Sequence, residues 1–163
     1  MTSEYIEELQ QLLIDDQQDI VSARSDLITN EHWLANVASR TNRVKQIIEK
    51  EGITANRIGD IEGYKAMLVL VLHSGNRDLL EQYLSLHATA DTNSIIPSDR
   101  AFVIDKLELL KNGKQLYGTQ FRIENGQAMP LSIENETDVD IRRLELGMGS
   151  LTDYLSSVEV RKD

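Results

Sequence analysis

Residues 61–73 read IEGYKAMLVLVLH, and this stretch is apolar almost all round. Its seven consecutive apolar residues, 66–72, fit either a buried strand or a buried helix, because periodicity alone does not separate the two. The polar Glu62 before the run and Ser74 and Gly75 after it favour a helix that other helices cover. The sequence therefore predicts a mainly α fold, a single-domain helical bundle around a buried central helix.

Amphipathic patterns on both sides of this stretch predict further helices. In each of them, apolar residues recur at the spacing that places them on one face of a helix. The helix that precedes the apolar run is expected to bury Trp33 and Leu34 near its start. The expected helices run from Thr2 or Ser3 to Leu27, from Glu31 to Lys50, from Asn76 or Asp78 to Leu86, and from Pro97 to Asn112.

The apolar period changes in the last third of the chain, where alternation replaces helical spacing. Asn125 and Gly126 are the strongest short signal for a hairpin turn, since both residues tolerate the positive φ that such turns need. The sequence therefore predicts one β-hairpin near the C-terminal third, with strands over 114–124 and 128–133, and Pro130 marks the second strand as an edge. A short helix from Thr137 or Asp138 to Leu146 and a last turn from Ser150 or Thr152 to Val160 complete the chain.

Length and composition narrow the classes of protein that fit. The chain has 163 residues, which favours one domain, 1–163, over two. It contains no cysteine, so disulfides, thiol catalysis and thiolate metal sites are excluded. With 17 basic and 27 acidic side chains, its formal net charge is -10. This sign opposes nucleic-acid binding and is compatible with a basic protein partner. The sequence leaves the oligomeric state open.

The sequence does not predict export or membrane insertion. The first residues carry Glu4, Glu7 and Glu8, where a signal peptide has positive charge ahead of an apolar run. The longest apolar stretch, 66–72, is far shorter than the roughly 20 residues that cross a bilayer. A cytoplasmic location without membrane contact is therefore expected.

Among the histidines, His73 is the candidate for chemistry, because it ends the most buried of the expected helices. An imidazole at that position could act as a base, an acid or a ligand. It could equally cap the carbonyl groups at the negative end of the helix. His32 and His87 lie at polar helix ends, and we expect both to face solvent.

Two acidic runs are candidates for holding a divalent cation. Asp15, Asp16 and Asp19 can share one helical face, and a second run over 134–140 lacks the glycine and the spacing of a calcium loop. Solvated acidic surface is the better interpretation of both runs, so no metal and no cofactor is predicted. Arg40 lies among other charged residues of its expected helix, and we expect it to pair at the surface.

The hexapeptide QLYGTQ, Gln115–Gln120, is a dense set of hydrogen-bonding groups. As part of a strand, it would place Gln115, Tyr117 and Thr119 on one face and Gln120 on the other. Two amides, a phenol and a hydroxyl can orient a polar ligand. The alternative is a hairpin strand that turns this polar face to water.

The same hexapeptide resembles the hallmark of a bacterial family known as domain-of-unknown-function family 6624. Other elements of that family follow in the same order along the chain, from about Asp16 to Leu155. The hexapeptide with Arg142, Arg143 and Gly147 downstream is the most specific part. The family has no established activity, so the resemblance implies site candidates and no reaction. The other similar positions are Asp16-Gln17, Gly52, Gly59, Leu72-His73, Ala101 to Asp105, Pro130, Ile133, Asp140 and Tyr154.

The residues and the resemblance together predict one polar pocket. His73 would carry a proton or act as a ligand donor, and Asp105 would orient it. Tyr117 and Gln120 would hold a polar substrate, and an arginine would balance anionic charge, because a planar guanidinium suits carboxylate or phosphate. The expected pocket contains His73, Asp105, Gln115, Tyr117, Thr119, Gln120 and Arg142 or Arg143, with Asp16 and Gln17 on its wall.

Two functions from different classes fit the sequence. The first is a small protein that binds or transforms a polar small molecule in this pocket, and the sequence does not decide whether it is an enzyme. The second is an acidic protein-interaction module, of immunity or anti-defence type, that masks a basic partner; its net charge of -10 supports it. The third possibility is that these polar groups only form hydrogen bonds within the fold and have no further function.

Overall fold

A computed structural model describes residues 3–53, 61–89 and 96–158. In these ranges the fold is mainly helical, with a two-stranded antiparallel hairpin in the C-terminal third, and the predicted fold class is confirmed. The chain divides into two compact units, Met1–Ile95 and Ile96–Asp163. A single domain over the whole chain stays a prediction. Gly59, one of the positions of the resemblance, and Val160, the expected end of the last turn, lie outside the described residues.

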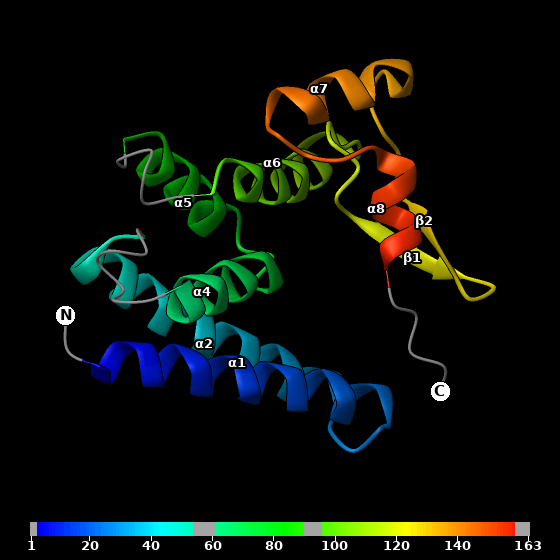
Figure 1. Cartoon of the computed structure of the whole chain (residues 1–163). Helices are drawn as coiled ribbons and strands as arrows, with labels where there is room; N and C mark the ends of the chain where they lie inside the picture. The colour runs from blue at the N-terminus through cyan, green and yellow to red at the C-terminus, as the bar shows by residue number, and fades with distance from the viewer. Residues whose placement is uncertain (1–2, 54–60, 90–95, 159–163) are drawn as a thin grey trace. The chain divides into compact units, whose positions relative to one another are not determined.

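The first unit consists of helices that pack against α4 (Ile61–His73). This helix contacts α1 (Ser3–Arg24), α2 (Asn30–Glu51) and α5 (Arg77–Thr89), and α1 also contacts α2 (Figure 1). The apolar run therefore forms a helix with the expected bounds and not a strand. A helix with neighbours on several sides must be apolar on those sides, and this explains the unbroken run.

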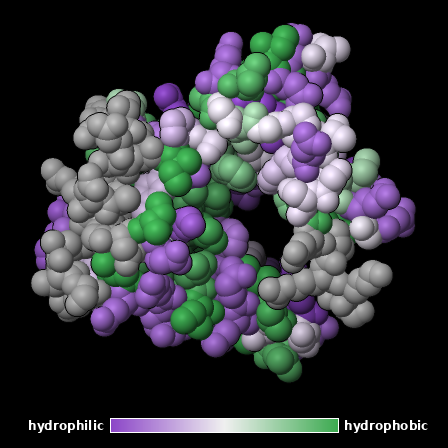
Figure 2. All heavy atoms as spheres, viewed as in Figure 1, coloured by the Kyte–Doolittle hydropathy of each residue, from purple (hydrophilic) through white to green (hydrophobic). Residues whose placement is uncertain are grey.

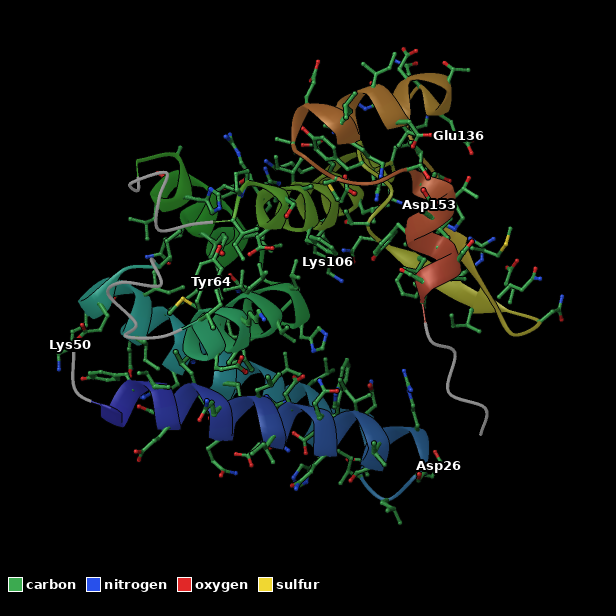
Figure 3. The ribbon with its side chains drawn as sticks, in the orientation of Figure 1. Asp26, Lys50, Tyr64, Lys106, Glu136 and Asp153 are labelled. Carbon is green, nitrogen blue, oxygen red and sulfur yellow. The ribbon has the colours of Figure 1, made fainter. Side chains whose placement is uncertain are left out.

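The core of this unit forms where α4 meets its neighbours. Tyr64 of α4 (labelled in Figure 3) is buried, and its hydroxyl accepts a hydrogen bond of 3.2 Å from the Tyr83 hydroxyl of α5. Each fully buried apolar side chain contributes roughly 1.5–3 kcal/mol relative to an exposed one. The buried apolar side chains of the unit include Leu9, Val44, Ile47, Ile48, Ala66, Met67, Leu70, Val71, Leu79 and Leu80.

Side chains cap two helix starts in the first unit. The Thr29 hydroxyl accepts a hydrogen bond of 3.2 Å from the His32 backbone N–H at the start of α2. The Asn76 side chain accepts one of 2.9 Å from the Leu79 N–H at the start of α5. Such caps satisfy backbone donors that have no partner within the helix. The sequence leaves Asn76 and Asp78 as candidates for the start of this helix, and Asn76 is the one that caps it.

Two apolar residues expected on buried helix faces are exposed instead. The prediction that the first helix reaches Leu27 is wrong, because α1 ends at Arg24 and the chain turns with Asp26 at a φ of 54°. Leu27 is 75% exposed, and Leu34, expected on the buried face of α2, is 52% exposed. Leu27 lies beyond the end of α1, and Leu34 lies to one side of the helix face on which α2 buries Val44 and Ile47.

The second unit opens with a helix and a hairpin. The helix α6 (Pro97–Asn112) starts at a proline and ends before a glycine, as the sequence predicts. Strand β1 (Phe121–Glu124) then pairs antiparallel with β2 (Gln127–Pro130). The Asn125-Gly126 turn between them has φ values of 50° and 75°, so the predicted hairpin turn is confirmed.

Both strands are shorter than predicted. Residues 114–120, expected in the first strand, form a loop whose bridge to the returning chain is a single parallel pair between Gln115 and Ile133. Pro130 is the last residue of β2 and pairs with Phe121. The side chains of Asp105 and Gln115 take up the hydrogen bonds that a strand would give to a neighbour, so this segment is held without a ladder.

Short helical segments complete this unit. The 3-10 segment η2 (Glu136–Asp138) leads directly into α7 (Val139–Glu145), where the sequence predicts a short helix. The last helix, α8 (Leu151–Ser157), follows Ser150, whose hydroxyl accepts a hydrogen bond of 3.1 Å from the Asp153 N–H (Figure 3). Ser150 is therefore the cap of the two candidates that the sequence offers.

Gly118 lies where the loop after α6 passes close to α8. Its φ is +71°, and a Cβ atom built on it would lie 2.6 Å from Leu151 Cδ1 and 3.2 Å from Ile133 Cδ1. Glycine suits both the left-handed backbone and the close approach. Gly113 has nearly the same φ, +72°, but its Cβ position has no described atom within 4 Å.

We expect Gly118→Ala to destabilise the protein more than Gly113→Ala does. Both substitutions place alanine in a left-handed conformation, at a cost of about 1 kcal/mol each. Only Gly118→Ala also overpacks its surroundings, at a further cost of about 1–3 kcal/mol. Urea unfolding followed by circular dichroism measures both variants. Equal losses of unfolding free energy would contradict the close packing around Gly118.

Candidate functional site

A histidine and a carboxylate meet in the first unit, at the C-terminal end of α4. His73 Nδ1 lies 2.6 Å from Asp16 Oδ2 of α1. Asp16 is 3% exposed, whereas the His73 side chain is 39% exposed. The contact joins a buried carboxylate to a half-exposed imidazole. We call Asp16, Gln17, Asp19, Arg40 and His73 the His73 cluster.

The contact with Asp16 fixes how the imidazole is protonated. An ionised carboxylate only accepts hydrogen bonds, so Nδ1 of His73 carries the proton and donates it to Asp16. In the neutral ring the lone pair then lies on Nε2, to which no described residue is hydrogen-bonded. A carboxylate that orients a histidine in this way leaves Nε2 available for proton transfer.

A guanidinium from α2 contacts Asp16 as well. Arg40 Nη2 lies 3.4 Å from Asp16 Oδ1, and Arg40 Nη1 lies 2.5 Å from Asp19 Oδ2. The Asn36 amide donates to Asp19 Oδ2 at 3.0 Å, and the Gln17 amide donates to Asp16 Oδ2 at 3.2 Å. Arg40 is 8% exposed, so the prediction that it pairs at the surface is wrong. Arg40 is buried because it pairs with Asp16 and Asp19 of α1.

Asp19 is easier to ionise than an ordinary aspartate. Burial raises its pKa, but hydrogen bonds from Arg40 and Asn36 and the positive charge of Arg40 outweigh burial and hold the pKa below 3.8. The carboxylate is therefore stabilised in its charged form, and its pairing with Arg40 persists into the acidic range.

A groove of about 360 Å³ lies between α1 and α2 and shares residues with the His73 cluster. Asp19 and Arg40 belong to both. Its other polar walls present carboxylate, amide and hydroxyl groups, and its volume fits a small polar molecule. The lining residues are Leu12, Asp15, Gln18, Asp19, Asn36, Ser39 and Arg40.

In the second unit, the carboxylate of Asp105 organises the loop over 114–120. Asp105 lies on α6 and is fully buried. It accepts hydrogen bonds from the backbone N–H groups of Leu116, Tyr117 and Thr119, at 2.7, 2.9 and 2.8 Å. The Thr119 hydroxyl donates a further one at 2.9 Å. Both carboxylate oxygens are thus satisfied, and charge-assisted bonds tie the loop to the helix that precedes it.

Gln115 holds the two ends of this loop together. Its buried Nε2 donates to the carbonyl oxygens of Gln120 at 2.8 Å and Leu131 at 2.9 Å. Its Oε1 accepts a hydrogen bond of 2.8 Å from the Gln120 N–H. Its backbone also bonds to Ser132 and Glu134. The side chain of Gln115 therefore takes the place of a neighbouring strand.

The two arginines of α7 also bind the backbone. Arg142 Nε donates to the Leu116 carbonyl at 2.8 Å. Arg143 is 2% exposed and donates to the carbonyl oxygens of Tyr117 and Gly149, both at 2.7 Å. Both guanidinium groups are therefore engaged with carbonyl groups of the unit itself.

Tyr154 of α8 packs against Arg143 and completes the enclosure of the loop. The Arg143 guanidinium lies 5.1 Å from the centre of the Tyr154 ring, and the Tyr154 hydroxyl donates to the Thr119 carbonyl at 3.0 Å. Burial raises the pKa of Tyr154 above 10.0, and the charge of Arg143 offsets part of that rise. The phenol therefore keeps its proton and stays a donor.

The expectation that Gln115–Gln120 is a strand with alternating faces is wrong. Gln115 and Thr119 are buried and bound within the unit, because the loop wraps around the Asp105 carboxylate. Tyr117 and Gln120 are half-buried, and no described residue is hydrogen-bonded to the Tyr117 phenol. The Gln120 amide donates only a long bond of 3.3 Å, to Thr119. Tyr117 and Gln120 therefore keep side-chain polar atoms for a ligand.

The predicted site residues fall into two groups. Asp16, and not Asp105, makes the contact that orients His73. A single pocket that both groups line stays a prediction. The first unit holds Asp16, Gln17 and His73, and the second holds Asp105, Gln115, Tyr117, Thr119, Gln120, Arg142 and Arg143.

The other histidines divide between surface and core. His32 is exposed, as expected. The prediction that His87 faces solvent is wrong, since His87 is 4% exposed and its ring lies 5.8 Å from that of Tyr83. Helical spacing explains the difference, because His87 lies one turn after the fully buried Tyr83 and shares its face.

Two further expectations concern metals and membranes. The acidic run over 134–140 has its carboxylate residues exposed, as expected of solvated surface. The same expectation for the run over 15–19 is wrong at Asp16, which is 3% exposed because Arg40 and His73 pair with it. Within the described ranges, no three His, Cys, Asp or Glu side chains gather as they would around a metal ion. The helices in that part of the chain are also too short or too polar to span a membrane.

A family model covers both units. It matches residues 8–161 and is described as a family of unknown function, DUF6624. The chain belongs to DUF6624. The predicted family is thus confirmed, and the match includes the His73 cluster as well as the loop over 114–120. No curated protein and no solved structure matches the chain significantly.

The sequence does not assign Asn36 and Arg40 to a site in this DUF6624 chain, and it considers Asp19 only as a possible cation ligand. A signal for them exists, because Asn36 and Arg40 share one helix face, as do Asp16 and Asp19. Their meeting depends on how α1 packs against α2, and spacing within a single helix does not specify it.

We expect Asp105→Asn to destabilise the protein by about 3 kcal/mol, because an amide cannot accept from all the donors that face the carboxylate. The loss of unfolding free energy in urea measures this effect. Asp138→Asn is the matched control, since Asp138 is exposed and bonds only the Thr137 hydroxyl at 3.4 Å. A small loss for Asp105→Asn, similar to that of the control, would contradict the organising role of Asp105.

We expect Asp19→Asn to destabilise the protein at neutral pH and much less in acid. The folded pKa of Asp19 is lowered below 3.8, so its ionised form stabilises the fold above that pH, and the stabilisation is lost as pH falls through the lowered value. Urea unfolding over a pH series compares the variant with wild type. Asp26→Asn, at an exposed position (Figure 3), is the control. A stability gap that stays constant with pH would contradict the assignment.

Proposed function

We propose that this protein binds and transforms a polar small molecule at His73, with the imidazole as the group that takes up and returns a proton. The observation that carries the proposal is the 2.6 Å contact between His73 Nδ1 and the buried Asp16 Oδ2. Burying a carboxylate costs free energy, and pairing it recovers that cost only in part. A chemical role accounts for this pair better than a gain in stability does.

Nε2 of His73 is the atom that exchanges a proton with the bound molecule. With the Nδ1 proton donated to Asp16, the neutral ring presents its lone pair at Nε2. When Nε2 accepts a proton, the Asp16 carboxylate stabilises the imidazolium that forms. The second oxygen of Asp16 faces Arg40, whose single positive charge offsets part of the charge of Asp16 and Asp19.

The surroundings support a polar substrate. The groove that shares Asp19 and Arg40 with the His73 cluster offers carboxylate, amide and hydroxyl groups, which bind molecules rich in hydroxyl or amine groups. Within the second unit taken by itself, we retain Tyr117 and Gln120 as ligand contacts, because their side chains keep polar atoms available. The loop residues that we assign to shaping this segment are Asp105, Gln115, Thr119, Arg142 and Arg143.

Diethyl pyrocarbonate tests this proposal, because it acylates an imidazole nitrogen that has a free lone pair. We expect His73 and the exposed His32 to be labelled, and the buried His87 to be spared, when peptides are analysed by mass spectrometry. A panel of sugar phosphates, amino acids, nucleosides and hydroxy acids is then added at millimolar concentration. A compound that binds at His73 slows the labelling of His73 and leaves that of His32 unchanged.

Two variants show whether Asp16 sets this reactivity. Asp16→Asn replaces a carboxylate that only accepts by an amide whose NH2 group can donate to Nδ1, so the ring tautomer is no longer fixed and we expect labelling at His73 to lose its preference for Nε2. Asp15→Asn is the matched control, since Asp15 bonds only Gln11, at 2.8 Å. The proposal fails if His73 resists labelling or if no compound of the panel protects it.

A further inference from the structure

The short helix α7 has two faces of opposite character. Residues 140, 141, 144 and 145 project from one side of a helix, at 100° per residue. Ile141 is 62% exposed and Leu144 is 75% exposed, and Asp140 and Glu145 beside them are exposed as well. A short helix that leaves both of its central apolar side chains in water presents them as a surface.

The cations of α7 lie on the other face. Arg143 is buried, and Arg142 is half-buried and donates to the carbonyl oxygens of Glu134 and Asn135, at 2.7 and 3.2 Å. Basic residues are few in this part of the sequence. After Lys114, the other Lys and Arg residues are Arg122, Arg161 and Lys162. Their inward placement leaves the outer face of α7 with negative charge.

The segment before α7 extends this negative charge. Glu136 (labelled in Figure 3) and Asp138 of η2 are both exposed. In Figure 2, hydrophobic and hydrophilic residues lie next to one another over the region that Figure 1 labels α7. We call Glu136, Asp138, Ile141, Leu144 and Glu145 the α7 face. Asp140 beside them is not included, because it accepts a hydrogen bond of 2.7 Å from the Leu151 N–H of α8.

We propose that the α7 face docks a basic amphipathic segment of a partner protein. Its apolar pair receives one or two apolar side chains, and the carboxylates around the pair receive Lys or Arg side chains that flank them on the partner. Complementary charge steers such an encounter and fixes its register, while the buried apolar contact supplies affinity. The net charge of -10 on the whole chain favours approach of the same kind of partner.

Charge also decides against other occupants of the α7 face. A second copy of this chain would bring a like set of carboxylates against it, which is repulsive. An anionic lipid surface is repelled for the same reason. A basic segment is the occupant for which both the apolar pair and its acidic border are favourable.

A synthetic helix of leucine and lysine, with all lysines on one face, is the probe that tests the proposal. We expect its addition to the ¹⁵N-labelled full chain to shift amide resonances of η2 and α7. The double variant Ile141→Ser/Leu144→Ser should weaken binding about tenfold, as expected for two partly buried side chains. Added salt should weaken binding further, since the acidic border is exposed.

Two controls distinguish binding at the α7 face from non-specific attraction of the peptide to acidic residues. Leu110→Ser removes another half-exposed apolar side chain of the same unit and should leave binding unchanged. A peptide with glutamine in place of lysine should not bind. Shifts spread over all acidic segments, unchanged affinity of the double variant, or self-association that the double variant abolishes would each overturn the proposal. The test involves no residue of the His73 cluster, so its outcome is independent of the function proposed for His73.

Discussion

A carboxylate that is removed from water must be given donors, and this constraint shapes both units of the chain. Asp16 is 3% exposed and Asp105 is 0% exposed. Either one would be costly to bury alone. In each unit, donors from outside the helix that carries the carboxylate meet at it. For Asp16 these are side chains from α2 and α4, and for Asp105 they are backbone groups of the loop after α6.

The two carboxylates are satisfied in different ways, and the difference separates structure from chemistry. Asp105 receives all its hydrogen bonds from a loop that it holds in place, so its environment is closed. Asp16 receives part of its bonding from His73, whose ring is half-exposed and has a second nitrogen. A buried acid behind a half-exposed base can act on a molecule from outside, and this is why the first unit carries the proposed function.

The sequence predicts the helices better than it predicts the contacts between them. The apolar run over 61–73 and the Asn125-Gly126 turn are local signals, and both are confirmed because local physics decides them. The loop over 114–120 departs from its strand prediction because Asp105, on the preceding helix, takes its amides. Arg40 departs because its partners lie on another helix. Periodicity within one element places such side chains on a common face, but it does not specify which groups of another element they bind.

The hydrogen bonds to Asp105 bear on how fast the amides of the loop over 114–120 exchange their hydrogens with water. Amides in loops normally exchange their hydrogens with water quickly, since they open without the rest of the fold. The amides of Leu116, Tyr117, Thr119 and Gln120 are instead bound to side chains. Their exchange requires Asp105 or Gln115 to release them. In isotope exchange we therefore expect these amides to be protected like those of α6, although the loop has neither helical nor strand geometry.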